Sequence, residues 1–108
     1  MASAADFIEN VRKYRSNASE DTVGKIVKHL GIALQNRDSS LVSCSDQSEL
    51  DRVRESWCQK KLGSDKSEDE LNAIINDVCA EMADEKGHKH RVTFYYLVAD
   101  KLDKLITL

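Results

Sequence analysis

The sequence contains no proline and only four glycines in 108 residues. Both residues weaken the interior of a helix, because proline removes a backbone N–H and glycine loses the most conformational entropy on folding. Their scarcity therefore favours helical structure. The sequence also lacks any run of about 18 apolar residues, the minimum for a transmembrane helix. Its first residues have no basic stretch followed by an apolar one, so we expect neither a membrane span nor a secretory signal.

Cysteine is sparse, with three residues that lie far apart: Cys44, Cys58 and Cys79. An odd number at these separations is typical of neither a disulfide framework nor a zinc site. We therefore expect free thiols in a reducing cytoplasm. Cys58 and Cys79 lie beside apolar positions and are expected to pack as small hydrophobic residues. Cys44 lies in a polar loop, but no sequence signature pairs it with a general base, so a catalytic thiol is not expected.

The charge balance excludes an overall attraction to polyanions. The net charge is −3 and the isoelectric point is near 5.6, so neither nucleic acid nor an anionic membrane is an expected partner. A local basic patch on the third helical segment would comprise Arg52, Arg54, Lys60 and Lys61. Acidic residues interrupt that patch, which argues against a recognition helix. With 41% apolar and 32% charged residues, the composition is typical of one globular domain over residues 1–108.

Five amphipathic segments with helical spacing follow one another along the chain, at about 4–15, 19–34, 46–62, 67–86 and 92–106. Their boundaries carry recognisable signals. Ser19 is a candidate N-cap, and capping boxes are expected at Asp46 with Glu49 and at Ser67 with Glu70. Glycine is expected to end the third segment at Gly63 and the fourth at Gly87.

The fifth segment is the ambiguous one, because Val92–Val98 is β-branched and aromatic enough for a buried strand. No second strand-like run exists to pair with it, which favours a helix. Helical spacing places one set of residues on a single face: Phe94, Tyr95, Val98, Leu102, Leu105 and Ile106. Tyr96 and Leu97 fall on the opposite side, so the helix is apolar almost all round, as expected of an enclosed helix. The predicted fold is all-α, a compact bundle of about five short helices with the last helix central.

The densest polar cluster, Lys86 to Arg91, immediately precedes this last helix. Lys89 and Arg91, together with free N–H groups at the start of the helix, would form an anion site. The alternative is structural, with both cations paired to nearby carboxylates. His88 and His90 supply at most two metal ligands, and no Cys or His stands at a recognised spacing to complete a site. No metal or other cofactor is therefore predicted. His29 is interpreted as a boundary residue of the second helix.

Several motifs in this chain resemble a family of small bacterial proteins that is catalogued as a domain of unknown function. The resemblance rests on Ser43-x-Ser45-Asp46, Glu49-Leu50 with Val53, Lys60-Lys61-Leu62-Gly63, and Lys89-x-Arg91-x-x-Phe94-Tyr95-Tyr96-Leu97. It covers the C-terminal two-thirds of the chain, and Cys44 stands where a serine is expected. The resemblance implies a bacterial cytoplasmic protein with a compact helical fold and supplies no activity.

Two functions follow as hypotheses, and an enzyme that uses the same loop pocket is a more remote third. The first is a non-enzymatic domain that binds a protein partner or forms a homodimer through the last helix. The alternative is an anion or small-molecule binding domain that uses the basic loop. The candidate ligand or partner residues for both are Ser45, Asp46, Lys89, Arg91, Tyr95 and Tyr96, and no catalytic residue is predicted. We expect the loops before the third and last helices to meet, with Ser45 or Asp46 near Arg91.

Overall fold

The computed structural model describes residues 4–31, 41–84 and 89–105. Its elements are helices α1 (Ala4–Tyr14), α2 (Glu20–Leu30), α3 (Gln47–Arg52), α4 (Glu68–Glu81) and α5 (Arg91–Lys101), the π-helical segment η2 (Val53–Lys61), and strands β1 (Leu41–Val42) and β2 (Lys89–His90). The predicted all-α bundle with a central last helix is confirmed. No helix in the described part of the chain has the length and apolar character needed to cross a membrane.

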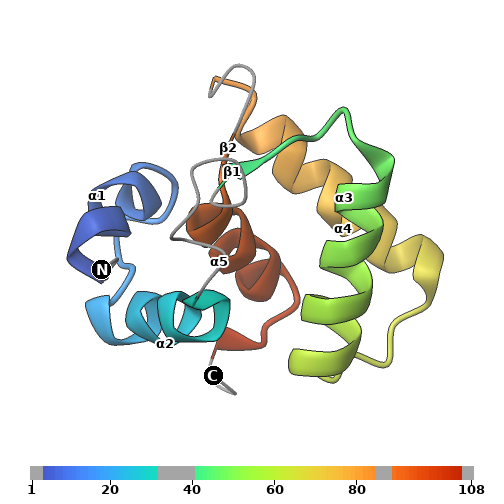
Figure 1. Ribbon diagram of the computed structural model, residues 1–108, viewed down its shortest axis with the longest axis horizontal. Coiled ribbons are helices and arrows are strands. Elements are labelled where there is room, and N and C mark those ends of the chain that lie inside the picture. Colours follow the sequence, from blue (N-terminus) through green and yellow to red (C-terminus); the bar gives the residue numbers. More distant parts are fainter. Residues whose placement is uncertain (1–3, 32–40, 85–88, 106–108) are drawn as a thin grey trace.

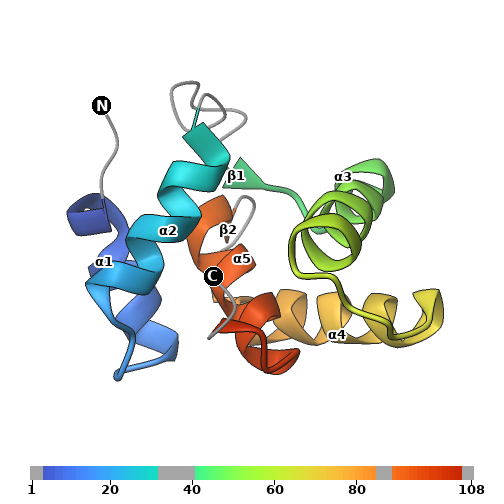
Figure 2. The same ribbon diagram turned by 90° about the horizontal axis from the view of Figure 1, so that it is seen from below.

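Helix α5 is the centre of the molecule. It contacts α1, α2, α4 and η2, and the views in Figures 1 and 2 place α1 and α2 on one side of it and α3, η2 and α4 on the other. Every residue from Arg91 to Ala99 is buried. Because neighbours surround α5, apolar side chains on all its faces are covered, as the sequence pattern predicted.

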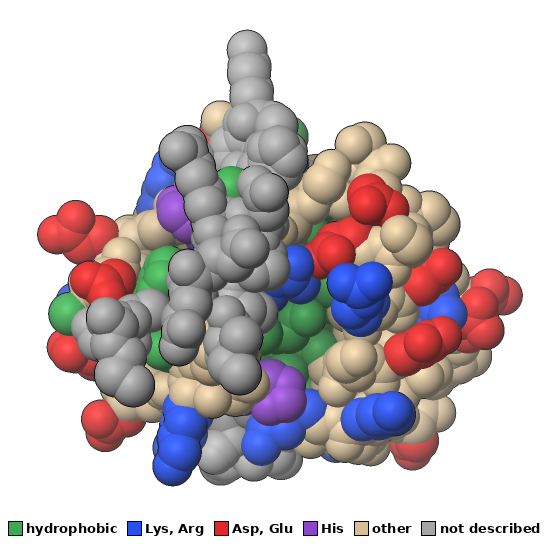
Figure 3. Space-filling model, viewed as in Figure 1, with side chains coloured by type: hydrophobic (Ala, Val, Ile, Leu, Met, Phe, Trp, Pro, Cys, Tyr) green, Lys and Arg blue, Asp and Glu red, His purple; other side chains and the backbone are tan. Residues whose placement is uncertain are grey.

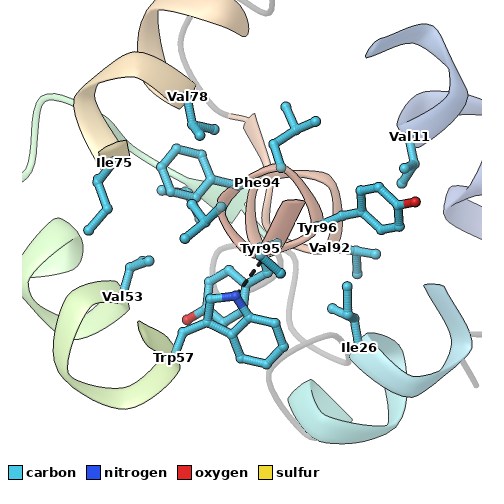
Figure 4. Close-up of a cluster of buried hydrophobic side chains, with 14 of the residues drawn as sticks. Val11, Ile26, Val53, Trp57, Ile75, Val78, Val92, Phe94, Tyr95 and Tyr96 are labelled. Carbon is cyan, nitrogen blue, oxygen red and sulfur yellow. Dashed lines mark hydrogen bonds between the residues drawn. The ribbon is translucent and has the colours of Figure 1, made fainter. Parts of the chain in front are cut away.

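The core packs around α5 from both sides. Figure 4 shows Val11 and Ile26 on one side and Val53, Ile75 and Val78 on another. Trp57 is fully buried, and its indole N–H donates a 3.0 Å hydrogen bond to the backbone carbonyl of Tyr95. This bond satisfies the polar end of a side chain that otherwise contributes a large apolar area to the core.

A short antiparallel strand pair precedes α5. Leu41 pairs with His90 and Val42 with Lys89, and Val42 is fully buried. The aromatic segment itself is helical in α5, as expected. The strand pair just before it was indicated by no sequence pattern. This pair brings together the two loops that were expected to meet.

The sequence predicted a single regular helix for the third segment, but the structure contains an α-helix followed by a π-helical segment. Asp46 caps α3 by accepting from the N–H of Ser48, but from Val53 the helix widens, and the N–H of Leu62 bonds to the carbonyl of Trp57 five residues earlier. This wider winding places Trp57 and Leu62 on one face, and both are buried. The segment ends before Gly63, whose positive φ of 62° suits glycine, as predicted.

Three helices end earlier than their apolar patterns indicated. Helix α2 ends at Leu30, with Gly31 as its C-cap, rather than near position 34. Helix α4 ends at Glu81 rather than near Gly87, and Asp84 in the following turn accepts from the hydroxyl of Tyr14. Helix α5 ends at Lys101, and Asp103 adopts a positive φ of 57° that interrupts the helix. The predictions for Gly87 and Ile106 lie outside the described residues.

The cysteine interpretation was wrong for two of the three residues. Cys44, which follows β1, and Cys79 in α4 form a disulfide with a Cα–Cα distance of 6.0 Å. Folding places these residues together although 35 positions separate them in the chain, a proximity that linear spacing does not reveal. Disulfides persist mainly in oxidising compartments, so the cysteines no longer support a reducing cytoplasm. Cys58 is the free, buried thiol.

Candidate functional site

The predicted basic loop is built into the structure around Arg91, which is 7% exposed. Its guanidinium forms an ion pair with Glu49 of α3, donates to the carbonyl of Leu41 at 3.2 Å and contacts the hydroxyl of Tyr95 at 3.4 Å. The hypothesis that the two loops meet is confirmed. The partner of Arg91, however, is Glu49 instead of Ser45 or Asp46.

Glu49 therefore does not act as the reciprocal half of a capping box. Its carboxylate turns toward Arg91, because a buried guanidinium needs an opposite charge more than an exposed helix terminus does. Asp46 caps α3 alone, and its hydrogen bond from the Ser48 hydroxyl lowers the pKa of its carboxyl group. Ser45 bonds to Ser43 at 2.9 Å, and both Ser45 and Asp46 are exposed.

Tyr95 and Tyr96 are core residues, each only 4% exposed. Tyr95 packs its ring against Trp57 at 4.8 Å, and burial raises the pKa of its hydroxyl, as it does for Tyr96. Lys89 is also buried. Tyr96 and the fully buried Leu97 are enclosed within the chain, so these two residues present almost no surface to a partner. Of the predicted site residues, Arg91 and Tyr95 therefore belong to a buried structural junction with Glu49 and Leu41, whereas Ser45 and Asp46 lie exposed outside it.

A second group of charged side chains joins α1, α4 and α5. Arg15 donates to Glu81 and, at 2.7 Å, to Asp100, while Lys101 lies 3.4 Å from Glu81. The side-chain hydrogen bond to Glu81 raises the pKa of Arg15, and the same bond lowers the pKa of Glu81. Cations and carboxylates are equal in number here, which indicates a role in holding the helices together.

This network predicts a loss of stability in acid. The pKa of Glu81 is lower in the folded chain than in the unfolded chain, so its contribution is present above the unfolded pKa of about 4.3 and disappears as the pH falls. In urea unfolding between pH 6 and 3, Arg15→Gln should reduce the pH dependence of the unfolding free energy. An unchanged slope would show that Arg15 does not set the pKa of Glu81.

Among the described residues, another cluster of cations lacks carboxylate partners and lines a pocket, which we call the basic pocket. Lys25, Lys28 and His29 of α2 and Lys61 at the end of η2 line a pocket of about 330 Å³. None of these three lysines forms an ion pair with a described carboxylate, in contrast to Arg15, Arg54 and Arg91. Figure 3 shows Lys or Arg side chains around a His along the lower edge of this face, with most acidic side chains at its left and right margins.

The helix geometry explains this convergence. Residues at positions i, i+3 and i+4 share one side of a helix, so Lys25, Lys28 and His29 project together from α2. The apolar residues Val23, Ile26 and Val27 occupy the buried side. Lys61 is the last residue of η2, and it reaches the same pocket because η2 ends beside this part of α2.

His29 forms the wall of the pocket nearest the core. Its ring packs against Trp57 with a centroid distance of 5.0 Å. Partial burial lowers the pKa of His29, and the positive charge of Lys61 lowers it further. His29 is therefore predominantly neutral at pH 7, while the lysines that surround it are charged.

The sequence interpretation did not assign the basic pocket. It treated His29 as a boundary residue and considered Lys61 as part of a patch for nucleic acid and of a family motif, but not as part of a pocket. In the structure Arg54 is withdrawn from that patch, because it is buried and bonded to Asp51 and Asn72. The Lys25-x-x-Lys28-His29 spacing was the available signal, although nothing in the sequence placed Lys61 beside it.

Other candidate chemistry is limited within the described residues. They contain no group of three or more His, Cys, Asp or Glu side chains arranged for a metal ion. His90 contacts the edge of the Phe7 ring, and His88 lies outside the described residues. Burial raises the pKa of the Cys58 thiol to about 12, which opposes formation of the nucleophilic thiolate.

Comparison with known proteins supports the motif resemblance and extends it toward the N-terminus. No curated protein matches the chain. A family model described as a protein of unknown function, DUF2853, matches residues 6–106, which include α2 and η2 with the basic pocket as well as the aromatic helix α5. With nearly its whole length matched, the chain belongs to the DUF2853 family of proteins of unknown function.

Proposed function

We propose that this protein is a non-enzymatic domain that binds a small phosphate-bearing anion in the basic pocket. The observation that carries the proposal is the convergence of Lys25, Lys28 and Lys61 on one pocket without a described carboxylate partner. Positive charges that line the same pocket repel one another, and a bound anion offsets that repulsion. The ammonium groups also supply the charge-assisted hydrogen bonds that phosphate oxygens accept.

The position of the cations in α2 does not account for the whole cluster. Lys28 and His29 lie in the last turn of α2, where the helix dipole favours positive charge. Lys61 belongs to another element, so the dipole of α2 gives no reason for its approach. The pocket holds no described nucleophile or carboxylate beside these cations, which supports binding in preference to catalysis.

This assignment keeps the anion-binding hypothesis but moves its site. Glu49 neutralises Arg91 at the end of the loop before α5, and Tyr96 and Leu97, the α5 residues expected to meet a partner, are buried. The basic pocket remains exposed to solvent on α2 and η2, since Lys25, Lys28, His29 and Lys61 all belong to the exposed residues.

Thermal unfolding with inorganic phosphate, sulfate and diphosphate, at constant ionic strength, tests the proposal. An anion present at about 100 times its dissociation constant stabilises the fold by roughly 2.7 kcal/mol. For a domain of this size, the melting temperature should rise by about 10 °C. Sodium chloride at the same ionic strength is the control for general screening, and it should give no comparable rise.

Lysines that line the pocket should contribute more to anion binding than a neighbouring lysine outside it. Lys61→Gln and Lys28→Gln should each weaken diphosphate binding about tenfold, since a charge-assisted hydrogen bond contributes about 1.5 kcal/mol or more. Lys60→Gln is the matched control, because it removes the same charge from an adjacent exposed residue that does not line the pocket. Isothermal titration calorimetry measures all three variants.

Three results would contradict the proposal. One is the absence of binding to all three anions. Another is equal weakening by Lys60→Gln and Lys61→Gln, which would indicate a diffuse charge effect. The third is binding to a single-stranded RNA oligonucleotide without binding to any small anion, which would assign these lysines to a nucleic-acid surface.

A further inference from the structure

We propose that His29 couples anion binding in the basic pocket to proton uptake, so that the pocket holds a dianion more tightly in mildly acidic solution. This inference rests on the proposed function and adds a regulatory property to the same site. It starts from the position of His29, whose ring packs on Trp57 and lines a pocket shared with three lysines.

The charges that face His29 determine its protonation. Lys25 and Lys28 lie on its own helix, and Lys61 approaches from η2. The neighbour on its inner side is the uncharged indole of Trp57, whose N–H is already bonded to the carbonyl of Tyr95. The described residues lining the pocket thus present positive charge and no negative charge, which opposes a further proton on the ring.

A bound dianion reverses this balance. Its negative charge compensates the lysines, and an oxygen within reach of the imidazole favours the protonated ring, which donates from both nitrogens. The pKa of His29, lowered in the free protein by burial and by Lys61, then rises in the complex. Binding therefore takes up a proton in the pH range between the two pKa values.

The geometry also explains why histidine, and not a fourth lysine, suits this position. An imidazole is uncharged near neutral pH, so it packs on the Trp57 ring without adding to the repulsion among the lysines. Near neutral pH it becomes a fourth positive charge mainly when a bound anion raises its pKa. The pocket thereby gains affinity from a group that adds little repulsion to the empty state.

Sulfate is the appropriate probe, because it remains a dianion over the whole range tested. Its dissociation constant should be about threefold to tenfold lower at pH 5.5 than at pH 7.5, within the limit of tenfold per pH unit that one proton allows. His29→Gln should bind with little pH dependence and should be most impaired at pH 5.5. His90→Gln is the matched control, since it removes an exposed histidine outside the pocket and should retain the dependence.

Calorimetry in two buffers of different ionisation enthalpy, at pH 6.5, measures the proton directly. Wild-type protein should take up a measurable fraction of one proton per sulfate, and His29→Gln should take up almost none. If sulfate binds equally at both pH values, or if His29→Gln keeps the dependence, the coupling is refuted while the anion site stands. If neither sulfate, phosphate nor diphosphate binds at any pH, the proposed function fails and the coupling fails with it.

Discussion

Reduction of the Cys44–Cys79 disulfide should lower the free energy of unfolding by about 4 kcal/mol, because the unfolded chain regains the entropy of a closed loop of about 35 residues. The bond joins the segment after β1 to α4. It therefore links α4, which packs against the central helix α5, to the segment between β1 and α3. For a domain of this size, such a loss is a large part of the total stability.

Urea unfolding with and without a non-thiol reductant measures this effect. The Cys44→Ser, Cys79→Ser double variant should have the stability of the reduced wild type and should not respond to the reductant. Alkylation followed by mass measurement should detect one free thiol in the oxidised chain, that of Cys58, and three after reduction. Three reactive thiols in the chain after mild oxidation, with no change in stability, would refute the bond.

Breaking the buried ion pair between Glu49 and Arg91 should cost about 3–5 kcal/mol of unfolding free energy. The side chains are 13% and 8% exposed, so either group left without its partner retains a charge that water solvates poorly. Glu49→Leu should therefore destabilise the chain strongly, and Arg91→Met should do so to a similar extent. The packing of Tyr95 against the same guanidinium adds to the second loss.

The double variant Glu49→Leu, Arg91→Met distinguishes a structural pair from a binding site. An apolar pair of similar size satisfies both positions, so the double variant should recover most of the stability that either single variant loses. Arg52→Met is the control, since Arg52 contacts Glu49 at 3.6 Å but is largely exposed, and its loss should cost less than about 1 kcal/mol. Additive effects of Glu49→Leu and Arg91→Met would contradict the pairing.

The same double variant should leave anion binding intact. Its residues lie in α3 and at the start of α5, whereas the basic pocket is lined by residues of α2 and η2. Retention of diphosphate binding, alongside a strongly reduced affinity in Lys61→Gln, would separate the structural cations from the binding cations. A loss of binding in the stable double variant would instead return the site to the loop before α5.

Sequence periodicity predicted the fold because local rules determine most of it. Ser19, Asp46 and Ser67 each accept a backbone N–H of their helix, as cap residues do, and Gly63 follows the third segment with a positive φ. The nearly continuous apolar surface of α5 required enclosure, and the surrounding helices provide it. These features depend on residues within one or two turns of each other, so the sequence displays them directly.

The charged partners could not be predicted in this way. Arg91 was expected near Ser45 or Asp46, but the rotation of α3 presents Glu49 one turn later. The disulfide between Cys44 and Cys79, and the approach of Lys61 to the cations of α2, depend on the same packing. Each contact joins residues more than thirty positions apart, and their distance is set by how whole helices pack.

What the sequence determined by itself was the helical fold, its principal caps and an aromatic last helix that must be buried. Those outcomes follow from local hydrogen bonding and from the hydrophobic effect acting on one helix at a time. Only the tertiary structure decided which charges are neutralised within the fold and which remain together on its surface. Electrostatic pairing requires close approach in space, so helix packing joined Arg91 to Glu49 and brought Lys61 beside Lys25 and Lys28, the arrangement on which the proposed anion site rests.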